Sequence, residues 1–274
     1  MARLIKRLLK AMQARRFAVL PLLSRATDSL FKQLSHRLLP SSCSFCLAPL
    51  QPPAGTLCYH CVAELPRLTT QCQWCAVALP KNALCGNCQQ NPPSYRRCIS
   101  AFHYQAPVDN IILRLKGNPY TTEIKQLCAI LAQHIAATYQ QAQLPCPQTI
   151  IPLPLHWLKM TKRGFNQSHI ISNLLAADLR REHKVTLEIR SDICRRILKG
   201  QDQHLLSAKK RRTSIKNAFI AEAKDLKGLS VAIVDDVVTT GATANSAAKA
   251  LLRAGAAQVD IWSIARTSWN NPTG

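Results

Sequence analysis

Hydrophobic and polar positions between residues 98 and 264 follow two different periods along the chain. Short apolar runs predict four strands, at 98–104, 148–153, 231–234 and 259–264, with 148–153 as the first strand of the sheet. Apolar residues three or four apart predict four helices, at 108–115, 123–140, about 168–181 and 245–254. Strands that alternate with helices predict an α/β fold, a mostly parallel sheet flanked by helices.

Residues 1–40 have a different pattern. Leu4, Ile5, Leu8, Leu9 and Met12 recur at helical spacing with basic residues between them, which is typical of a basic amphipathic helix. Such a helix suits a membrane surface or nucleic acid, and it can also imitate a transit peptide or reflect an over-extended reading frame. We expect a flexible, non-essential extension.

The segment 231–243 combines a predicted buried strand with carboxylate and hydroxyl side chains that can bind a ligand. Two carboxylates, Asp235 and Asp236, follow its four apolar residues. A turn and a helix come next, and the turn consists of Thr239, Thr240, Gly241, Ala242 and Thr243. A helix N-terminus with free N–H groups, a glycine and hydroxyls predicts an anion site, and the acids suit the hydroxyls of a sugar. A sugar phosphate is therefore the expected ligand; the alternative is an acidic, threonine-rich surface turn.

A second anion site is predicted where Lys162, Arg163 and Gly164 precede a helix. A ligand with both a 5′-phosphate and a pyrophosphate needs two such sites. The alternative is a basic surface loop.

Eight of the twelve cysteines form four C-x-x-C pairs: Cys43/Cys46, Cys58/Cys61, Cys72/Cys75 and Cys85/Cys88. Two pairs complete a closed tetrahedral zinc site, so we predict two structural Zn²⁺ ions, with the first pair joined to the second and the third to the fourth. Crossed pairing, an iron–sulfur site and catalytic thiols remain alternatives. We place this double zinc ribbon at 41–90.

The formal net charge of +22 favours a polyanionic partner over simple solubility. Residues 1–40 hold nine Lys/Arg and one acid, and 180–216 hold twelve Lys/Arg and four acids. The run most suited to a phosphate backbone is Lys209, Lys210, Arg211 and Arg212. The sequence has no apolar run of membrane-spanning length, and the paired cysteines indicate a reducing, cytoplasmic setting.

The segment 231–243 resembles the phosphoribosyl-diphosphate (PRPP) loop of type I phosphoribosyltransferases. With the cysteine pairs, 162–168 and 203–219, it also resembles the ComF/GntX family over residues 43–267, although Thr213 and Ser214 depart from the usual Arg-Asn. The resemblance implies a phosphoribosyltransferase-like domain at 95–269. It also implies that the acids hold the ribose hydroxyls, that residues 239–243 hold the 5′-phosphate, and that Mg²⁺ accompanies PRPP.

The family resemblance implies a role in DNA uptake for competence or in DNA utilisation. We expect a protein that binds single-stranded DNA and a phosphoribosyl ligand, cytoplasmic or peripheral to the inner membrane, beside a DNA-translocation machine. The alternative is an active phosphoribosyltransferase that transfers ribose 5-phosphate to a base-like acceptor. A third hypothesis is a regulator that keeps the phosphoribosyltransferase-like fold but does not catalyse a reaction.

Overall fold

The computed structural model describes residues 42–50, 55–197, 218–221 and 226–268. The chain divides into two compact units, Met1–Cys61 and Val62–Gly274. The predicted amphipathic helix at 1–40 lies outside the described residues. So does the basic run Lys209, Lys210, Arg211 and Arg212.

The larger unit contains a five-stranded sheet in the order β1-β7-β6-β2-β3, with all neighbours parallel. The strands are β1 (Arg97–His103), β2 (Thr149–Pro152), β3 (Glu188–Ile189), β6 (Ser230–Val238) and β7 (Gln258–Arg266). The α/β fold with a parallel sheet is thus confirmed. The expectation that 148–153 is the first strand is wrong, because β1 precedes it and pairs with β7.

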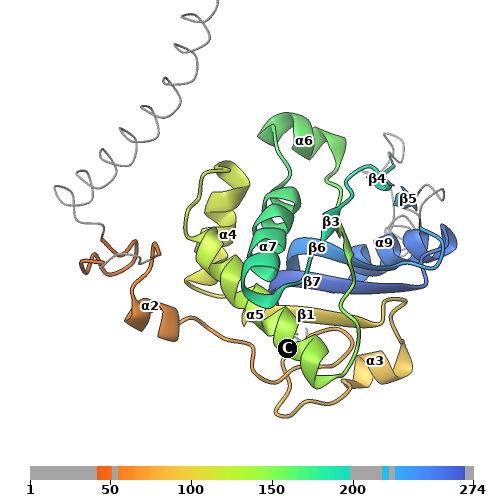
Figure 1. The fold of residues 1–274 in the computed structure, drawn as a ribbon, viewed down its shortest axis with the longest axis horizontal. Coiled ribbons are helices and arrows are strands. Elements are labelled where there is room, and N and C mark those ends of the chain that lie inside the picture. The colour runs from red at the N-terminus through yellow and green to blue at the C-terminus, as the bar shows by residue number, and fades with distance from the viewer. Residues whose placement is uncertain (1–41, 51–54, 198–217, 222–225, 269–274) are drawn as a thin grey trace, which may run out of the picture. The chain divides into compact units, whose positions relative to one another are not determined.

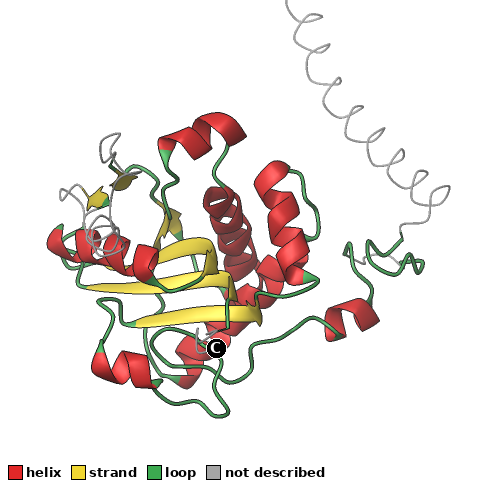
Figure 2. Ribbon diagram, turned by 180° about the vertical axis from the view of Figure 1, so that it is seen from behind, coloured by secondary structure: helices red, strands yellow, loops and turns green. Residues whose placement is uncertain are grey.

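Helices cover both faces of this sheet (Figures 1 and 2). They are α4 (Val108–Gly117), α5 (Ile124–Gln141), α7 (Gln167–His183) and α9 (Ala242–Arg253). Successive strand residues point to opposite faces. On β7, Asp260 and Trp262 contact Tyr139 of α5, whereas Val259 and Ile261 belong to the core beneath α9. Therefore α5 and α9 lie on opposite faces.

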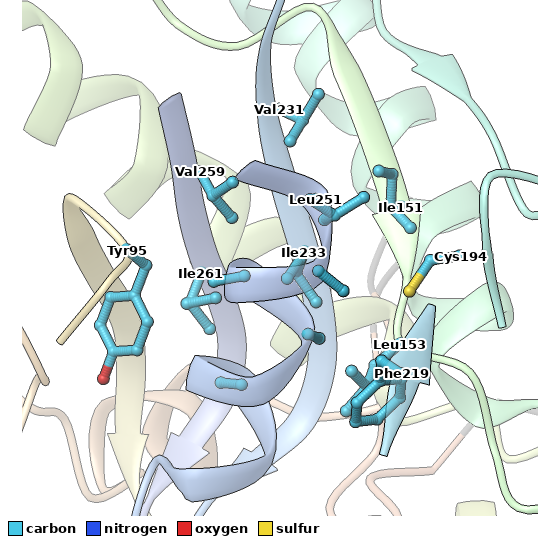
Figure 3. Close-up of a cluster of buried hydrophobic side chains, with 14 of the residues drawn as sticks. Tyr95, Ile151, Leu153, Cys194, Phe219, Val231, Ile233, Leu251, Val259 and Ile261 are labelled. Carbon is cyan, nitrogen blue, oxygen red and sulfur yellow. The ribbon is translucent and has the colours of Figure 1, made fainter. Parts of the chain in front are cut away.

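The core under α9 is built from alternate residues of the central strands. Ile233 of β6 and Ile261 of β7 meet Leu251 of α9 in one cluster of buried side chains (Figure 3). Phe219, from the two-stranded antiparallel sheet of β4 (Cys194–Arg196) and β5 (Phe219–Ala221), closes one side of this cluster. Small alanines on the buried side of α9 let it approach the strands closely.

Three short helices complete the described structure: α2 (Tyr59–Ala63), α3 (Gly86–Gln90) and α6 (Trp157–Arg163). The apolar periodicity does not predict α6, because Trp157, Leu158 and Met160 are exposed and no residue of α6 is buried. Among the described helices, none has the length and apolar character needed to cross a bilayer.

Candidate functional site

Asp235 and Asp236 lie within β6, which continues to Val238 rather than ending at Val234 as predicted. They sit near the carboxyl end of a central strand, where ligands meet open α/β sheets. Ser168 Oγ donates to Asp235 Oδ1 at 3.3 Å, and the Asp236 N–H donates to the same oxygen at 2.8 Å. Burial, followed by the nearby Asp236 charge, raises the pKa of Asp235 well above its usual range.

Asp236 has a cationic partner from another element. Lys116, in the last turn of α4, lies with Nζ 2.9 Å from Asp236 Oδ2, and the Asp236 side chain is only 7% exposed. Burial alone would raise the pKa of Asp236, but the hydrogen bond with Asp235 and the Lys116 charge lower it. The acid pair is therefore not two equivalent free carboxylates: Asp236 is ion-paired, and Asp235 holds its proton more tightly.

The turn after the acids leads through Gly241 into the start of α9. Gly241 adopts the left-handed region at φ 76° and caps α9, and a Cβ there would stand 3.1 Å from the Tyr95 hydroxyl oxygen. The Ala242 N–H donates to Thr240 Oγ1 at 3.3 Å, which orders the start of the helix. We call 235–243 the acid–threonine loop. The first turn of α9, beginning at Ala242 and Thr243, presents helix N–H groups that lack partners within the helix.

Arg266 holds this loop in place through its side chain. It is the last residue of β7, and its side chain is buried rather than open on the ligand side of the sheet. Its Nη1 donates to the Val238 carbonyl at 3.1 Å and to the Thr239 carbonyl, and its Nε donates to the Cys75 carbonyl at 2.8 Å. A sequence pattern cannot reveal this role, because the partners lie 28 and 191 residues away.

The predicted second anion site lies between two helices. Lys162 and Arg163 end α6, and Gly164 terminates it at φ 75°. Arg163 Nη1 donates to Gln167 Oε1 at 3.0 Å, and Asn166 caps α7 by accepting from the Ser168 N–H at 3.0 Å. Because Ser168 contacts Asp235, the start of α7 lies beside the acid pair. Sequence reasoning missed Ser168 and Lys116 as neighbours of the acids, although Ser168 stands inside a quoted motif.

The eight paired cysteines form two four-cysteine groups. The first consists of Cys43, Cys46, Cys58 and Cys61, and the second of Cys72, Cys75, Cys85 and Cys88. The first pair therefore joins the second and the third joins the fourth, without crossing. The ligand atoms within each group lie within 4.8 Å of one another.

The sulfur spacing fits zinc. Tetrahedral Zn²⁺ with Zn–S bonds of about 2.3 Å places sulfurs about 3.8 Å apart. Cys46 and Cys58 sulfurs are 3.6 Å apart in the first group, and Cys75 and Cys85 sulfurs are 3.7 Å apart in the second. Each group could thus hold one zinc ion with no open position for chemistry.

Backbone N–H groups prepare one thiolate in each group. The Cys58 N–H lies 3.3 Å from Cys43 Sγ, and the Cys85 N–H lies 3.4 Å from Cys72 Sγ. Burial raises the pKa of both thiols, but such N–H donors outweigh it and lower the pKa of Cys43 to about 6 and of Cys72 to about 7. In the same groups burial raises the pKa of Cys61 to about 12 and of Cys75 to about 11, so metal binding there must displace a tightly held proton.

The predicted contacts with a nucleic-acid backbone involve residues that the structure does not describe. These residues are Lys209, Lys210, Arg211 and Arg212. Four isolated cysteines, Cys98, Cys128, Cys146 and Cys194, belong to neither four-cysteine group. The first, second and fourth are buried, and Cys146 is half-buried.

Curated relatives match nearly their whole length to this chain. It is 33% identical to the DNA utilization protein YhgH of Salmonella typhi over 230 residues, 84% of this chain and 98% of that protein. It is 31% identical to competence protein F of Haemophilus influenzae, over 82% of this chain and 96% of that protein. Competence protein ComFC of Bacillus subtilis is 24% identical, over 80% of this chain and 87% of that protein.

The other comparisons add little. No family model matches the chain. A solved hypoxanthine phosphoribosyltransferase from Trypanosoma cruzi aligns with 52% of this chain and 63% of its own chain, at a TM-score of 0.33 and 18% identity. A hypoxanthine phosphoribosyltransferase from Staphylococcus aureus aligns with 54% of this chain and 74% of its own chain, at a TM-score of 0.31 and 12% identity. No ligand is inferred from likeness at this level.

Proposed function

The chain belongs to the family of the DNA utilization protein YhgH and competence protein F, and from this membership we propose that it handles single-stranded DNA and binds a phosphoribosyl ligand. In this proposal residues 41–90 are the zinc module, and 95–269 hold the ligand at the acid–threonine loop. The protein acts on the cytoplasmic side of the inner membrane, beside a DNA-translocation machine.

One observation carries the ligand: two acids lie near the carboxyl end of a central strand, and a short turn joins that strand to a glycine-capped helix start. Asp235 would accept a ribose hydroxyl, because no cation lies within ion-pair distance of its carboxylate among the described residues. Asp236 would accept the neighbouring hydroxyl while it remains paired with Lys116. Thr239, Thr240 and the α9 N–H groups would hold the 5′-phosphate.

The DNA function is supported by charge as well as by kinship. The chain carries 36 basic and 14 acidic residues. Phosphate contacts of this kind are indifferent to sequence and release counterions, so binding weakens steeply with salt. The run Lys209–Arg212 is the densest basic stretch in the sequence.

Single-strand binding can be tested by fluorescence anisotropy with a labelled oligothymidylate at several salt concentrations. Replacing the four basic residues at 209–212 by glutamine should weaken binding to every sequence alike. It should also reduce the slope of log K against log salt by about 3, from about 0.7 per phosphate contact. A matched variant neutralises four other basic residues that are exposed: Lys159, Lys184, Lys227 and Arg253. Binding that does not depend on salt would contradict the proposal.

A second candidate function is phosphoribosyl transfer, favoured by the contact between Ser168 and Asp235. This contact brings the start of α7 to the acid pair, and Lys162 and Arg163 stand a few residues before it. They would neutralise a leaving pyrophosphate, and Mg²⁺ bound with PRPP would add charge stabilisation there. Release of pyrophosphate from PRPP with a panel of bases, lost in Asp235→Asn, is the result this function requires.

A further inference from the structure

A cavity of the larger unit lies away from the acid–threonine loop. It encloses about 670 Å³, within the usual range for small-molecule sites. Arg96 and Arg97 line it where β1 begins, whereas the acids lie near the carboxyl end of β6. Because β1 and β6 both run parallel to β7, the cavity and the acid pair stand toward opposite ends of the sheet.

The cavity carries one positive charge that the described residues leave unpaired. Arg96 is neutralised, since its Nε donates to Asp260 Oδ1 at 3.0 Å. Arg97 has no carboxylate within ion-pair distance among the described residues, and its buried Nε has no hydrogen-bond acceptor there. Its guanidinium lies 5.5 Å from the centre of the Tyr139 ring, which holds it in place. No Asp or Glu side chain lines the cavity, but Cys72 of the second four-cysteine group does. A zinc-bound thiolate is anionic, so an anion in the cavity would depend on the Arg97 charge.

The rest of the lining suits a planar polar group. Trp74, between the cysteines of the third pair, offers a half-buried indole. Gln71 Nε2 is occupied, because it donates to the Ser100 carbonyl at 3.4 Å and lies 3.0 Å from His134 Nε2. Gln71 Oε1, in contrast, is buried without a partner among the described residues. Burial, with the Arg67 charge, lowers the pKa of His134, so this histidine adds no charge at neutral pH.

From these contacts we propose that this cavity binds a nucleoside 5′-monophosphate unit. The phosphate would meet Arg97, the base would stack on Trp74, and Gln71 Oε1 would accept a hydrogen bond from a base amino or imino group. The unit comes either from a free nucleotide or from one nucleotide of a single strand. The choice of ligand rests on the proposed DNA-handling function; the cavity itself does not.

The test uses the full-length, zinc-loaded protein, with calorimetry against thymidine 5′-monophosphate, unphosphorylated thymidine and the tetranucleotide (dT)₄. We expect Arg97→Gln to weaken binding of the monophosphate about tenfold, Arg97→Lys to retain most of it, and thymidine to bind poorly. Arg253→Gln removes one exposed arginine from α9 as a matched control and should change nothing. The monophosphate and (dT)₄ together identify the source: comparable binding of both indicates free nucleotides as well, and binding of (dT)₄ alone indicates the strand.

Fluorescence provides a second readout in case Arg97→Gln folds poorly. The ligand should quench tryptophan emission in the wild type, and Trp74→Phe should bind within threefold of it but lose the quenching. The cavity assignment is overturned if Arg97→Gln and Arg97→Lys both bind like the wild type. It is also overturned if Arg253→Gln weakens binding equally, or if neither ligand binds. PRPP binding, measured in the same variants, should survive Arg97→Gln, so failure here is distinct from failure at the acid–threonine loop.

Discussion

Arg266 donates a hydrogen bond from Nε to the carbonyl oxygen of Cys75 at 2.8 Å. The same guanidinium donates to the carbonyls of Val238 and Thr239. One buried side chain therefore connects a zinc ligand of the second four-cysteine group to the start of the turn that would hold a phosphate. The second four-cysteine group and the acid–threonine loop are therefore adjacent in this unit.

Replacing Arg266 should damage both features at once. We expect Arg266→Met to lower the free energy of unfolding by about 2–4 kcal/mol, because buried carbonyls lose a charged donor. Arg266→Lys keeps the charge but cannot span three carbonyls, and it should recover only part of the loss. Urea unfolding of the zinc-loaded protein measures the difference. Wild-type stability in Arg266→Met would show that these contacts contribute nothing.

Zinc stoichiometry tests the two four-cysteine groups. The purified protein should contain two zinc ions per chain by elemental analysis. Cys46→Ser and Cys85→Ser, one change in each group, should each reduce this to about one. Cys128→Ala, at a buried cysteine of α5 outside both groups, is the control and should retain two. A single shared ion lost in both variants would mean that the grouping is wrong.

Removing the charge of Asp235 should stabilise the protein above acidic pH. The folded state holds the Asp235 proton more tightly than the unfolded chain does. The stability that the protonated Asp235 side chain contributes is therefore present below about pH 4 and is lost as pH rises through the raised pKa. Asp235→Asn avoids this loss, so the Tm of the variant should exceed that of the wild type by a margin that grows from pH 4 to pH 8. Each kcal/mol of stability corresponds to about 2–4 °C in Tm. Equal margins at every pH would contradict the raised pKa.

The neighbouring Asp236 should behave in the opposite way. Its pKa is lowered, so its contribution is present above about pH 4 and is lost as pH falls through the lowered pKa. Lys116→Gln leaves the buried carboxylate unpaired and should cost about 1–3 kcal/mol at pH 7, with a smaller cost at pH 4. Lys116→Arg retains the charge and is the matched control. Urea unfolding of both variants at pH 7 and pH 4 measures this cost. A loss of unfolding free energy that does not depend on pH would argue against the ion pair.

Local pattern predicted the strands, the helices and the cysteine grouping, because each depends on residues close together in sequence. The parallel sheet followed from the alternation of strands with helices. The end of β6 was misplaced because the acids interrupt an apolar run that resumes at Val237 and Val238. The environment of the acids could not be predicted for a different reason. Lys116 lies 120 residues from Asp236, and a basic residue at a helix end otherwise indicates only a solvated C-terminus. Ser168 and Arg266 likewise gain their roles only through tertiary contacts.

The most direct test of the central claim is calorimetric titration of the zinc-loaded protein with PRPP and Mg²⁺. The account predicts one binding event per chain, reduced at least tenfold in the double variant Asp235→Asn/Asp236→Asn. The event should be unchanged in Asp178→Asn, which removes an acid of α7 that is ion-paired with Arg181. Binding of PRPP that is equally strong in the double variant, or absent from the wild type, would contradict a sugar-phosphate site at the acid–threonine loop.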